Sequence, residues 1–273
     1  MNSRLVSAIR IATGLLFFQH GAEKLWGFAS GQIDHNFLTL HGFAGPLEVV
    51  GGALIVFGLF TRLAAFILCG QMAVAYFDQW AWRSFFPISN GGEEAVIFCF
   101  VYLWLVAAGP GPWSVDASLG WEAKLARGLD RWEPLARGIA RIVLAFMLSL
   151  HGYRGVFGWL AKSAGRAAVI PLAIDKMPAW AGWVEVGGGL LLAVGLFTRV
   201  SAIVVCLELA AAYVLAAMPR GAWPIHNGGN ETLMYLVFFG FSVACGAGSF
   251  SLDAFWKGHR QPRGVLANAA RGY

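Results

Sequence analysis

Gly58-Leu59-Phe60-Thr61-Arg62 recurs unchanged as Gly195-Leu196-Phe197-Thr198-Arg199, 137 positions further along the chain. Self-similarity at a fixed period indicates repeated structural units. The same offset continues outward on both sides through residues whose identity is kept: Glu48 and Glu185, Gly51-Gly52 and Gly188-Gly189, Tyr76 and Tyr213, Asn90-Gly91-Gly92 and Asn227-Gly228-Gly229, Glu94 and Glu231, Asp116 and Asp253. The chain therefore contains two tandem copies of one unit.

The composition indicates a chain that resides in lipid. Of the 273 residues, 58% are hydrophobic and 13% are charged, whereas soluble domains carry about 25% charged residues. Several apolar runs approach the roughly 20 residues that span a bilayer. The sequence predicts an all-α, polytopic membrane protein with eight transmembrane helices, at residues 5–26, 43–60, 62–81, 91–109, 136–158, 179–197, 199–218 and 228–246.

These helices form two four-helix bundles, at residues 1–112 and 135–256. An amphipathic linker at 113–134 joins them, and a polar tail covers 257–273. Because each copy has an even number of spans, both copies cross the membrane in the same direction, as parallel repeats. His20-Gly21 recurs as His151-Gly152 only 131 positions later, so the second copy has six extra residues between its first two helices.

The distribution of basic residues predicts the orientation. The net charge is +5, but the lysines and arginines are scattered between apolar runs, with no dense basic stripe for nucleic acid. Most of the 20 basic residues lie on the same side of the predicted membrane as the N-terminus. By the positive-inside rule both termini are expected in the cytoplasm, with the chain in the cytoplasmic (inner) membrane of a bacterium.

This topology gathers polar side chains at the outer end of each copy. The members in the two copies are His20, Lys24, Glu48, Asn90 and Glu94, and His151, Glu185, His226, Asn227 and Glu231. Glu48 and Glu185 lie inside apolar sequence, where an ionisable group normally faces a partner or a cavity. A pocket for a polar head group such as a quinone carbonyl is one interpretation.

The other interpretation of this set is structural. His20 and Glu48 would pair only to hold the helices together, and Asn90 and Asn227 would be N-caps of the following helices, with Glu93 completing a capping box. The sequence leaves both interpretations open.

A further candidate lies deeper in the membrane. Glu208 comes ten residues after Thr198, about 15 Å along its helix, and the first copy has Gln71 at the matching position. We expect Glu208, with Gln71, to handle protons. Alternatively, the two side chains hydrogen-bond to each other between the copies.

Several classes of site are not expected. The four cysteines all lie in apolar segments without ligand spacing, which is typical of small buried hydrophobic residues. No histidine has a second ligand at the usual spacing, so neither a metal site nor a covalently bound cofactor is predicted. Nucleotide-binding and hydrolase motifs are missing from the sequence, and enzymatic activity is left open.

The combined motifs resemble those of the DoxX family over nearly the whole chain, twice. They are Arg10 with His20-Gly21-x-x-Lys24, Glu48-x-x-Gly51-Gly52, Gly58-Leu59-x-Thr61-Arg62, Asn90-Gly91-Gly92-x-Glu94, and Gly109-x-Gly111-x-x-Ser114-x-Asp116. The second copy departs at Gly155, where the first has Lys24, and at Asn230, where the first has Glu93. The resemblance does not extend to those two side chains in that half.

The resemblance implies a four-helix membrane unit related to the small membrane subunit of a thiosulfate:quinone oxidoreductase. It also implies membrane or redox protein partners and a quinone ligand, and it supplies no catalytic residue. The first functional hypothesis is thus a membrane subunit of a quinone-linked oxidoreductase complex. A non-enzymatic scaffold subunit of a respiratory or photosynthetic assembly is the second, and a small-molecule transporter is the third.

Overall fold

The computed structural model describes residues 3–28, 40–121, 128–158 and 179–260, and all the regular secondary structure in these ranges is helical. The main helices of the first unit are α1 (Ser3–Trp26), α2 (Leu40–Phe57), α3 (Thr61–Gln79) and α5 (Glu93–Ala108). Those of the second are α8 (Glu133–Phe157), α9 (Ala179–Val194), α10 (Thr198–Ala212) and α12 (Asn230–Cys245). A helix is thus present at each of the eight predicted places.

Shorter helices connect or follow the main ones. They are α4 (Pro87–Asn90), α6 (Val115–Leu119), the 3₁₀ turn η1 (Asp130–Trp132), the π-helical η3 (Tyr213–Ala217), the 3₁₀ turn η4 (Met218–Arg220), α11 (Pro224–Asn227) and α13 (Leu252–Arg260). Parts of the predicted linker (122–127) and tail (261–273), and most of the longer connection of the second copy (159–178), lie outside the described residues.

Length and composition identify some of the helices as membrane spans. Within the described ranges, three helical segments are long and apolar enough to cross a bilayer: Arg4–Trp26, Asp130–Phe157 and Thr198–Arg220. Three further apolar helices are shorter, at Gly42–Phe57, Trp180–Val194 and Asn230–Cys245. Large apolar side chains project from the outer faces of α3 and α10, including Phe66, Phe77, Val200 and Leu207. Faces of this kind suit contact with lipid chains.

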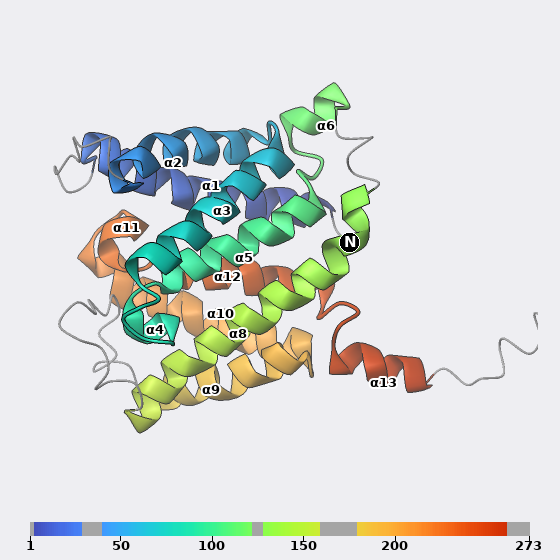
Figure 1. Ribbon diagram of the computed structural model, residues 1–273. Helices are drawn as coiled ribbons and strands as arrows, with labels where there is room; N and C mark the ends of the chain where they lie inside the picture. The colour runs from blue at the N-terminus through green and yellow to red at the C-terminus, as the bar shows by residue number, and fades with distance from the viewer. Residues whose placement is uncertain (1–2, 29–39, 122–127, 159–178, 261–273) are drawn as a thin grey trace, which may run out of the picture.

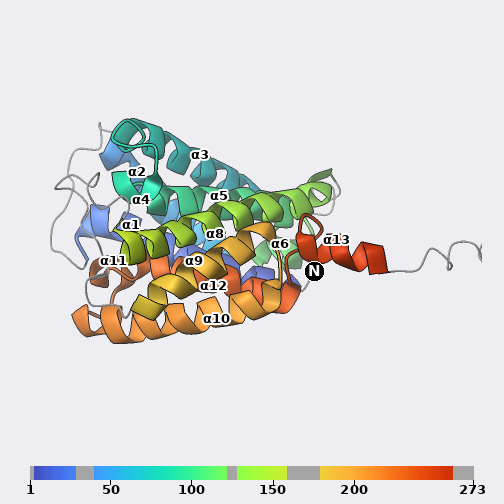
Figure 2. The ribbon, with the colours of Figure 1, turned by 90° about the horizontal axis from the view of Figure 1, so that it is seen from below.

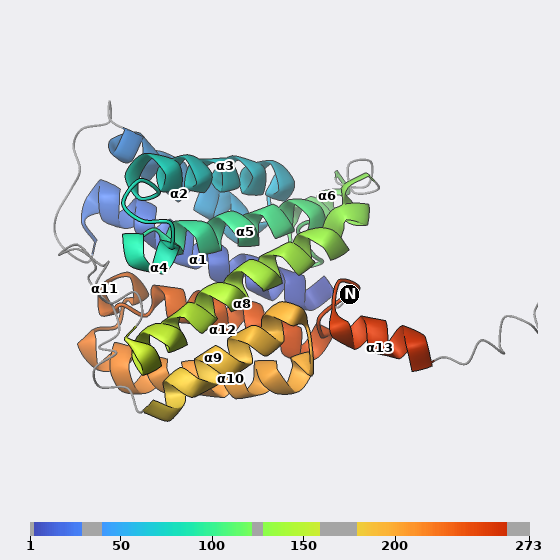
Figure 3. The same ribbon diagram turned by 60° about the horizontal axis from the view of Figure 1, so that its bottom comes forward.

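The two units have the same internal arrangement. In the first, α1 packs on α2 and α3 packs on α5, and in the second α8 packs on α9 and α10 on α12. Helices α1 and α8 both run from the end that carries α6 and α13 to the end that carries α4 and α11 (Figures 1 and 3). The copies are therefore parallel repeats, as predicted.

The units meet through equivalent helices. Helix α5 packs on α8, its counterpart α12 packs on α1, and α5 and α12 also touch each other; Figure 2 shows these helices at the centre of the molecule. Trp104 of α5 is fully buried, with its ring 5.2 Å from that of Phe241, and its indole N–H donates to Glu133 at 3.1 Å. One apolar core therefore crosses the boundary between the units.

The repeated motif forms the sharp turn between the second and third helices of each unit. Gly58 and Phe60 have φ angles of 68° and 50°, and Gly195 and Phe197 have 69° and 48°. Left-handed backbone ends a helix and favours glycine. This geometry explains why α2 and α9 end three residues earlier than the predicted boundaries.

An aspartate that is present in both copies holds this turn in place. Asp116 accepts hydrogen bonds from the amides of Phe60 and Thr61 and from the Thr61 hydroxyl, each at 2.8 Å. Asp253 accepts from the amides of Phe197 and Thr198 at 2.9 Å. The aspartate after the fourth helix thus caps the third helix of the same unit, which otherwise would have unpaired N–H groups.

Replacing this cap is expected to lower stability. In the Asp116→Ala variant the amides of α3 lose their acceptor, at a cost of about 1–2 kcal/mol. The variant should unfold at a lower temperature in detergent. Ser118→Ala, which alters an exposed neighbour in α6, is the control. Equal midpoints of thermal unfolding for the two variants would contradict the capping role.

The cap of the second unit is charged at neutral pH. Burial alone would raise the pKa of Asp253, but hydrogen bonds from Thr198 and Phe197 and the charge of Lys257 outweigh it, so the pKa lies below its usual value. A lowered folded-state pKa contributes stability above the unfolded value of about 3.9, and this contribution disappears as the pH falls through the folded-state pKa.

A buried arginine joins helix ends on the side of each unit where its first helix begins. Arg10 in α1 donates to the carbonyls of Ile55, Val56, Pro110 and Trp113, with distances of 2.6 Å to Val56 and 2.8 Å to Pro110. Its counterpart in α8, Arg141, donates to the matching carbonyls of Ala193, Ala247 and Phe250. Each guanidinium satisfies the carbonyls at the end of one helix and in the segment after another.

Glycine sets the contact between the first two helices of each unit. A Cβ atom at Gly21 would lie 2.6 Å from the Val49 amide and 2.7 Å from the Gly45 carbonyl. At Gly152 it would lie 2.6 Å from the Val186 amide. The backbones of these helices therefore approach each other closely, as small residues allow in membrane bundles.

Candidate functional site

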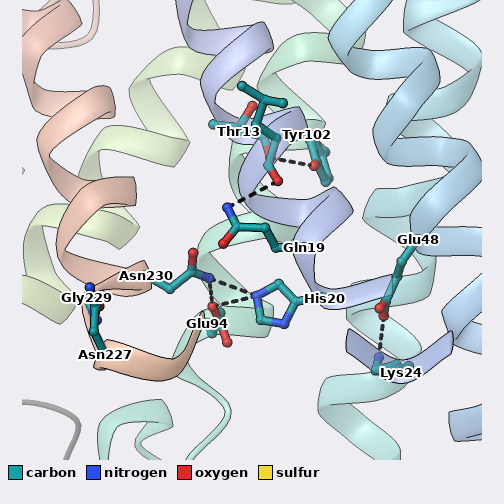
Figure 4. Close-up of polar contacts among 11 residues, drawn as sticks. Thr13, Gln19, His20, Lys24, Glu48, Glu94, Tyr102, Asn227, Gly229 and Asn230 are labelled. Atoms are coloured by element: carbon teal, nitrogen blue, oxygen red, sulfur yellow. Dashed lines mark hydrogen bonds and ion pairs between the residues drawn. The ribbon is translucent and has the colours of Figure 1, made fainter. Parts of the chain in front are cut away.

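A histidine from one unit meets a side chain from the other near the C-terminal end of α1. His20 Nε2 lies 3.0 Å from Glu94 Oε1, at the start of α5, and 2.8 Å from the amide nitrogen of Asn230, at the start of α12 (Figure 4). That same amide also donates to Glu94. The predicted partner Glu48 acts on His20 only through its charge. No hydrogen bond joins the two among the described residues, because Glu48 accepts from Lys24 and Gln71 instead.

The matching position in the second unit has the same plan with different chemistry. His151 Nε2 lies 2.7 and 2.8 Å from the two carboxylate oxygens of Glu93, which comes from the first unit. The buried Tyr235 hydroxyl donates to Glu93 as well. A carboxylate oxygen of Glu231, the counterpart of Glu94, lies within 4.8 Å of the Glu93 and His151 ligand atoms.

The two arrangements are related by the repeat. Each combines a histidine, the glutamate of its own unit and a side chain from the other unit. The side chain from the other unit is Asn230 beside His20 and Glu93 beside His151, and these two equivalent positions are called the crossing position. The name central cluster is used below for these six residues at the interface of the units: His20, Glu93, Glu94, His151, Asn230 and Glu231.

A cavity of about 430 Å³ adjoins the central cluster in the first unit. Part of its apolar wall is formed by Phe43, Ile67 and Val74, which are exposed on the surface. Its polar wall is formed by His20, Lys24, Glu48, Gln71, Asp78, Gln79 and Glu94. The name first-unit pocket is used for this cavity. It joins predicted candidates from α1, α2 and α5 with Gln71 of α3.

Glu48 is the centre of the polar wall. The Lys24 ammonium donates to Glu48 Oε1 at 2.6 Å and the Gln71 amide donates at 3.0 Å. Glu48 Oε2 and Gln71 Oε1 are buried and have no hydrogen-bond partner among the described residues. The alternative in which Gln71 bonds to Glu208 between the copies is wrong, since the Gln71 amide donates to Glu48 in its own unit.

The second unit lacks this arrangement because two residues differ. Gly155 replaces Lys24, and Glu208 replaces Gln71. Glu208 is 4% exposed, and neither of its carboxylate oxygens has a partner within the described part of the chain. Glu208 and His151 are close enough for electrostatic interaction with Glu185, the counterpart of Glu48. Acidic residues therefore accumulate on this side of the interface.

Asn90 and Asn227 have a structural role that differs from the predicted one. Asn90 ends α4, accepts from the Gly92 amide at 2.7 Å and donates to the Ser84 carbonyl at 2.9 Å. Asn227 makes the equivalent bonds to Gly229 and Gly221. The N-caps of α5 and α12 are Gly92 and Gly229, without side-chain caps. The asparagines hold the connecting loops and leave Glu93 free to reach His151.

His226 makes another contact between the units. Its Nε2 lies 3.2 Å from the Glu23 carboxylate of α1. Sequence analysis assigned Glu93 to a capping box, noted Asn230 only as a difference between the copies and did not single out Tyr235, although the adjacent pair Glu93-Glu94 at the start of an apolar segment was a signal. Their partners lie on the other unit, which a comparison of copies within the sequence does not show.

Comparison with known proteins agrees with the repeat. The model of the DoxX family matches residues 5–79 and 136–218, which are the first three helices of each unit. An uncharacterized protein of Haemophilus influenzae is 38% identical over 117 residues, which cover 40% of this chain and 85% of that protein. That relative therefore corresponds in length to about one unit. The chain matches no solved structure.

Proposed function

This chain belongs to the DoxX family, and from that premise we propose that it is the membrane subunit of a quinone-linked oxidoreductase complex in the inner membrane of a bacterium. A quinone head group binds in the first-unit pocket. All eight main helices cross the bilayer and both termini face the cytoplasm, so the pocket opens in the outer leaflet. The observation that carries this proposal is the polar wall next to apolar side chains exposed to lipid.

The donors and acceptors of the pocket fit such a ligand. Lys24 and His20 offer N–H groups for a quinone carbonyl, and Glu48 Oε2 and Gln71 Oε1 are acceptors without a donor among the described residues. Unpaired buried acceptors are costly, and the hydroxyl groups of a reduced quinone would satisfy them. Binding sites of this kind are mostly apolar with a few convergent polar groups.

A bound quinone supplies two-electron redox chemistry, with the electrons coming from a partner subunit. The residues of the pocket orient the ring and hold protons at its edge, at the Glu48 carboxylate and at the His20 ring. Glu208 belongs to the other unit, where it holds a proton near His151 and Glu185. Phe43 and Ile67 keep the open side in contact with lipid rather than with water.

Glu48→Gln is expected to weaken quinone binding by about 10- to 100-fold, since a charge-assisted interaction is worth roughly 1.5–3 kcal/mol. Glu185→Gln, the same change at the repeated position in the second unit, is the matched control and should leave the affinity unchanged. Binding of ubiquinone or menaquinone analogues to the purified full chain measures both. Unchanged affinity in both variants would reject the pocket.

Purification from the native membrane in mild detergent tests the wider proposal. Mass spectrometry of the co-purifying proteins and lipids should find redox subunits together with a quinone. Partner proteins without quinone would instead assign the chain a scaffold role, and the polar substitutions would then reduce only stability.

A further inference from the structure

We propose that Glu93, His151 and Glu231 bind a divalent transition-metal ion between the two units. The three residues come from α5, α8 and α12, and their ligand atoms all lie within 4.8 Å of one another. One imidazole nitrogen and two carboxylates form a mixed donor set that suits zinc, manganese or iron. The site is separate from the first-unit pocket and does not depend on the proposed function.

Charge at the interface favours a cation there. Glu93 is 4% exposed, and a carboxylate oxygen of Glu231 lies within 4.8 Å of its ligand atom. Two like charges at this separation repel each other strongly away from water. Glu185 and Glu208 add further carboxylates within electrostatic range of His151, and Arg154 is the basic group that acts on Glu231. Four carboxylates thus lie within electrostatic range of His151, and one arginine acts on one of them.

The first unit provides an independent observation that points to a cation. There the repeat-related residues are Asn230, His20 and Glu94, and the amide nitrogen of Asn230 touches both the ring nitrogen and the carboxylate. Its N–H groups supply positive charge between the two. In the second unit Glu93 replaces this amide, so a carboxylate lies where the first unit has N–H donors, and a metal ion would supply positive charge at this place.

A neighbouring side chain holds the Glu93 carboxylate in place as a ligand. The Tyr235 hydroxyl donates to Glu93, and such neighbours fix the orientation of metal ligands. Glu208 is buried near His151, and both of its oxygens are unpartnered within the described ranges. The sequence could not show this site, because its ligands lie on three helices and one of them comes from the other unit.

Cobalt(II) is the probe, because its visible absorption reports an ordered site. Full-length protein that carries no histidine tag is stripped with a chelator in detergent and titrated with Co²⁺. Wild type should bind one Co²⁺ per chain, and Zn²⁺ should displace it. A folded wild type that binds none would overturn the proposal, and a protonated His151 between the carboxylates would then explain the arrangement.

Two reciprocal substitutions give each unit the residue that the other unit has at the crossing position. Glu93→Asn gives the second unit the amide already present in the first and should abolish Co²⁺ binding. Asn230→Glu places a carboxylate beside His20 and Glu94 and should raise the stoichiometry to two. Size-exclusion and thermal unfolding confirm that each variant folds. One bound Co²⁺ in the folded Glu93→Asn variant would overturn the assignment.

Glu48→Gln separates this proposal from the quinone proposal. It alters the first-unit pocket, at a distance from the three proposed ligands, and should leave Co²⁺ binding unchanged. Glu231→Gln removes a ligand but no pocket residue, so Co²⁺ binding should fall while quinone affinity stays the same. The two proposals can therefore fail independently.

Discussion

The Arg10→Met variant is expected to be less stable than wild type by about 3–5 kcal/mol, the loss that follows when one partner of a buried charged network is removed. Arg10 is fully buried and donates to four backbone carbonyls, of which only that of Pro110 accepts a second side-chain hydrogen bond among the described residues, from the Ser7 hydroxyl at 3.4 Å. Methionine fills similar volume but donates nothing. The carbonyls at the end of α2 and after α5 would lose their donor in an apolar setting.

Thermal or denaturant unfolding in detergent measures this loss. Arg4→Met changes an exposed arginine one and a half turns earlier in α1 and is the control. Arg10→Lys keeps the charge but lacks the planar fork that serves several acceptors at once, so it should restore only part of the stability. Full stability of Arg10→Met would show that the carbonyls do not need the guanidinium.

Gly21→Ala is the second large expected effect. The added methyl group would meet the backbone of α2 at 2.6 Å, so α1 and α2 must separate, at a cost of about 1–3 kcal/mol. Because α1 also carries His20 and Lys24, the separation should weaken ligand binding in the first-unit pocket as well. Unfolding and quinone titration of one protein preparation measure both consequences.

Gly70→Ala provides the matched control. Gly70 lies in α3, and a Cβ there would have no atom within 4 Å. Alanine is a better helix former than glycine by about 1 kcal/mol, so this variant should be as stable as wild type or more so. If both glycine variants behave alike, the close approach of α1 and α2 is not important for stability.

The helices could be predicted from the sequence because lipid imposes a strong local constraint. An apolar run of suitable length must be helical in a bilayer, and the repeat supplied each prediction twice. The ends were less predictable. Gly91 has a φ of 85°, so α5 cannot start there and begins at Glu93, where the sequence pattern placed the start two residues earlier.

The residues of the candidate site could be predicted better than the contacts between them. His20, Lys24, Glu48 and Glu94 do lie around one cavity. Their pairing depends on how α5 and α12 cross the boundary between the units, and no local spacing encodes that crossing. Glu93 and Asn230 were identified as a difference between the copies but not as site residues, yet this difference is what separates the two halves of the central cluster.

Fusion of the two units has an evolutionary consequence at this crossing position. In a symmetric homodimer of identical single units, both crossing positions would carry the same residue, either two glutamates or two asparagines. After duplication within one gene, the two positions could diverge independently. The fused chain can therefore keep an amide beside His20 and a carboxylate beside His151, a combination that a homodimer of identical units cannot have.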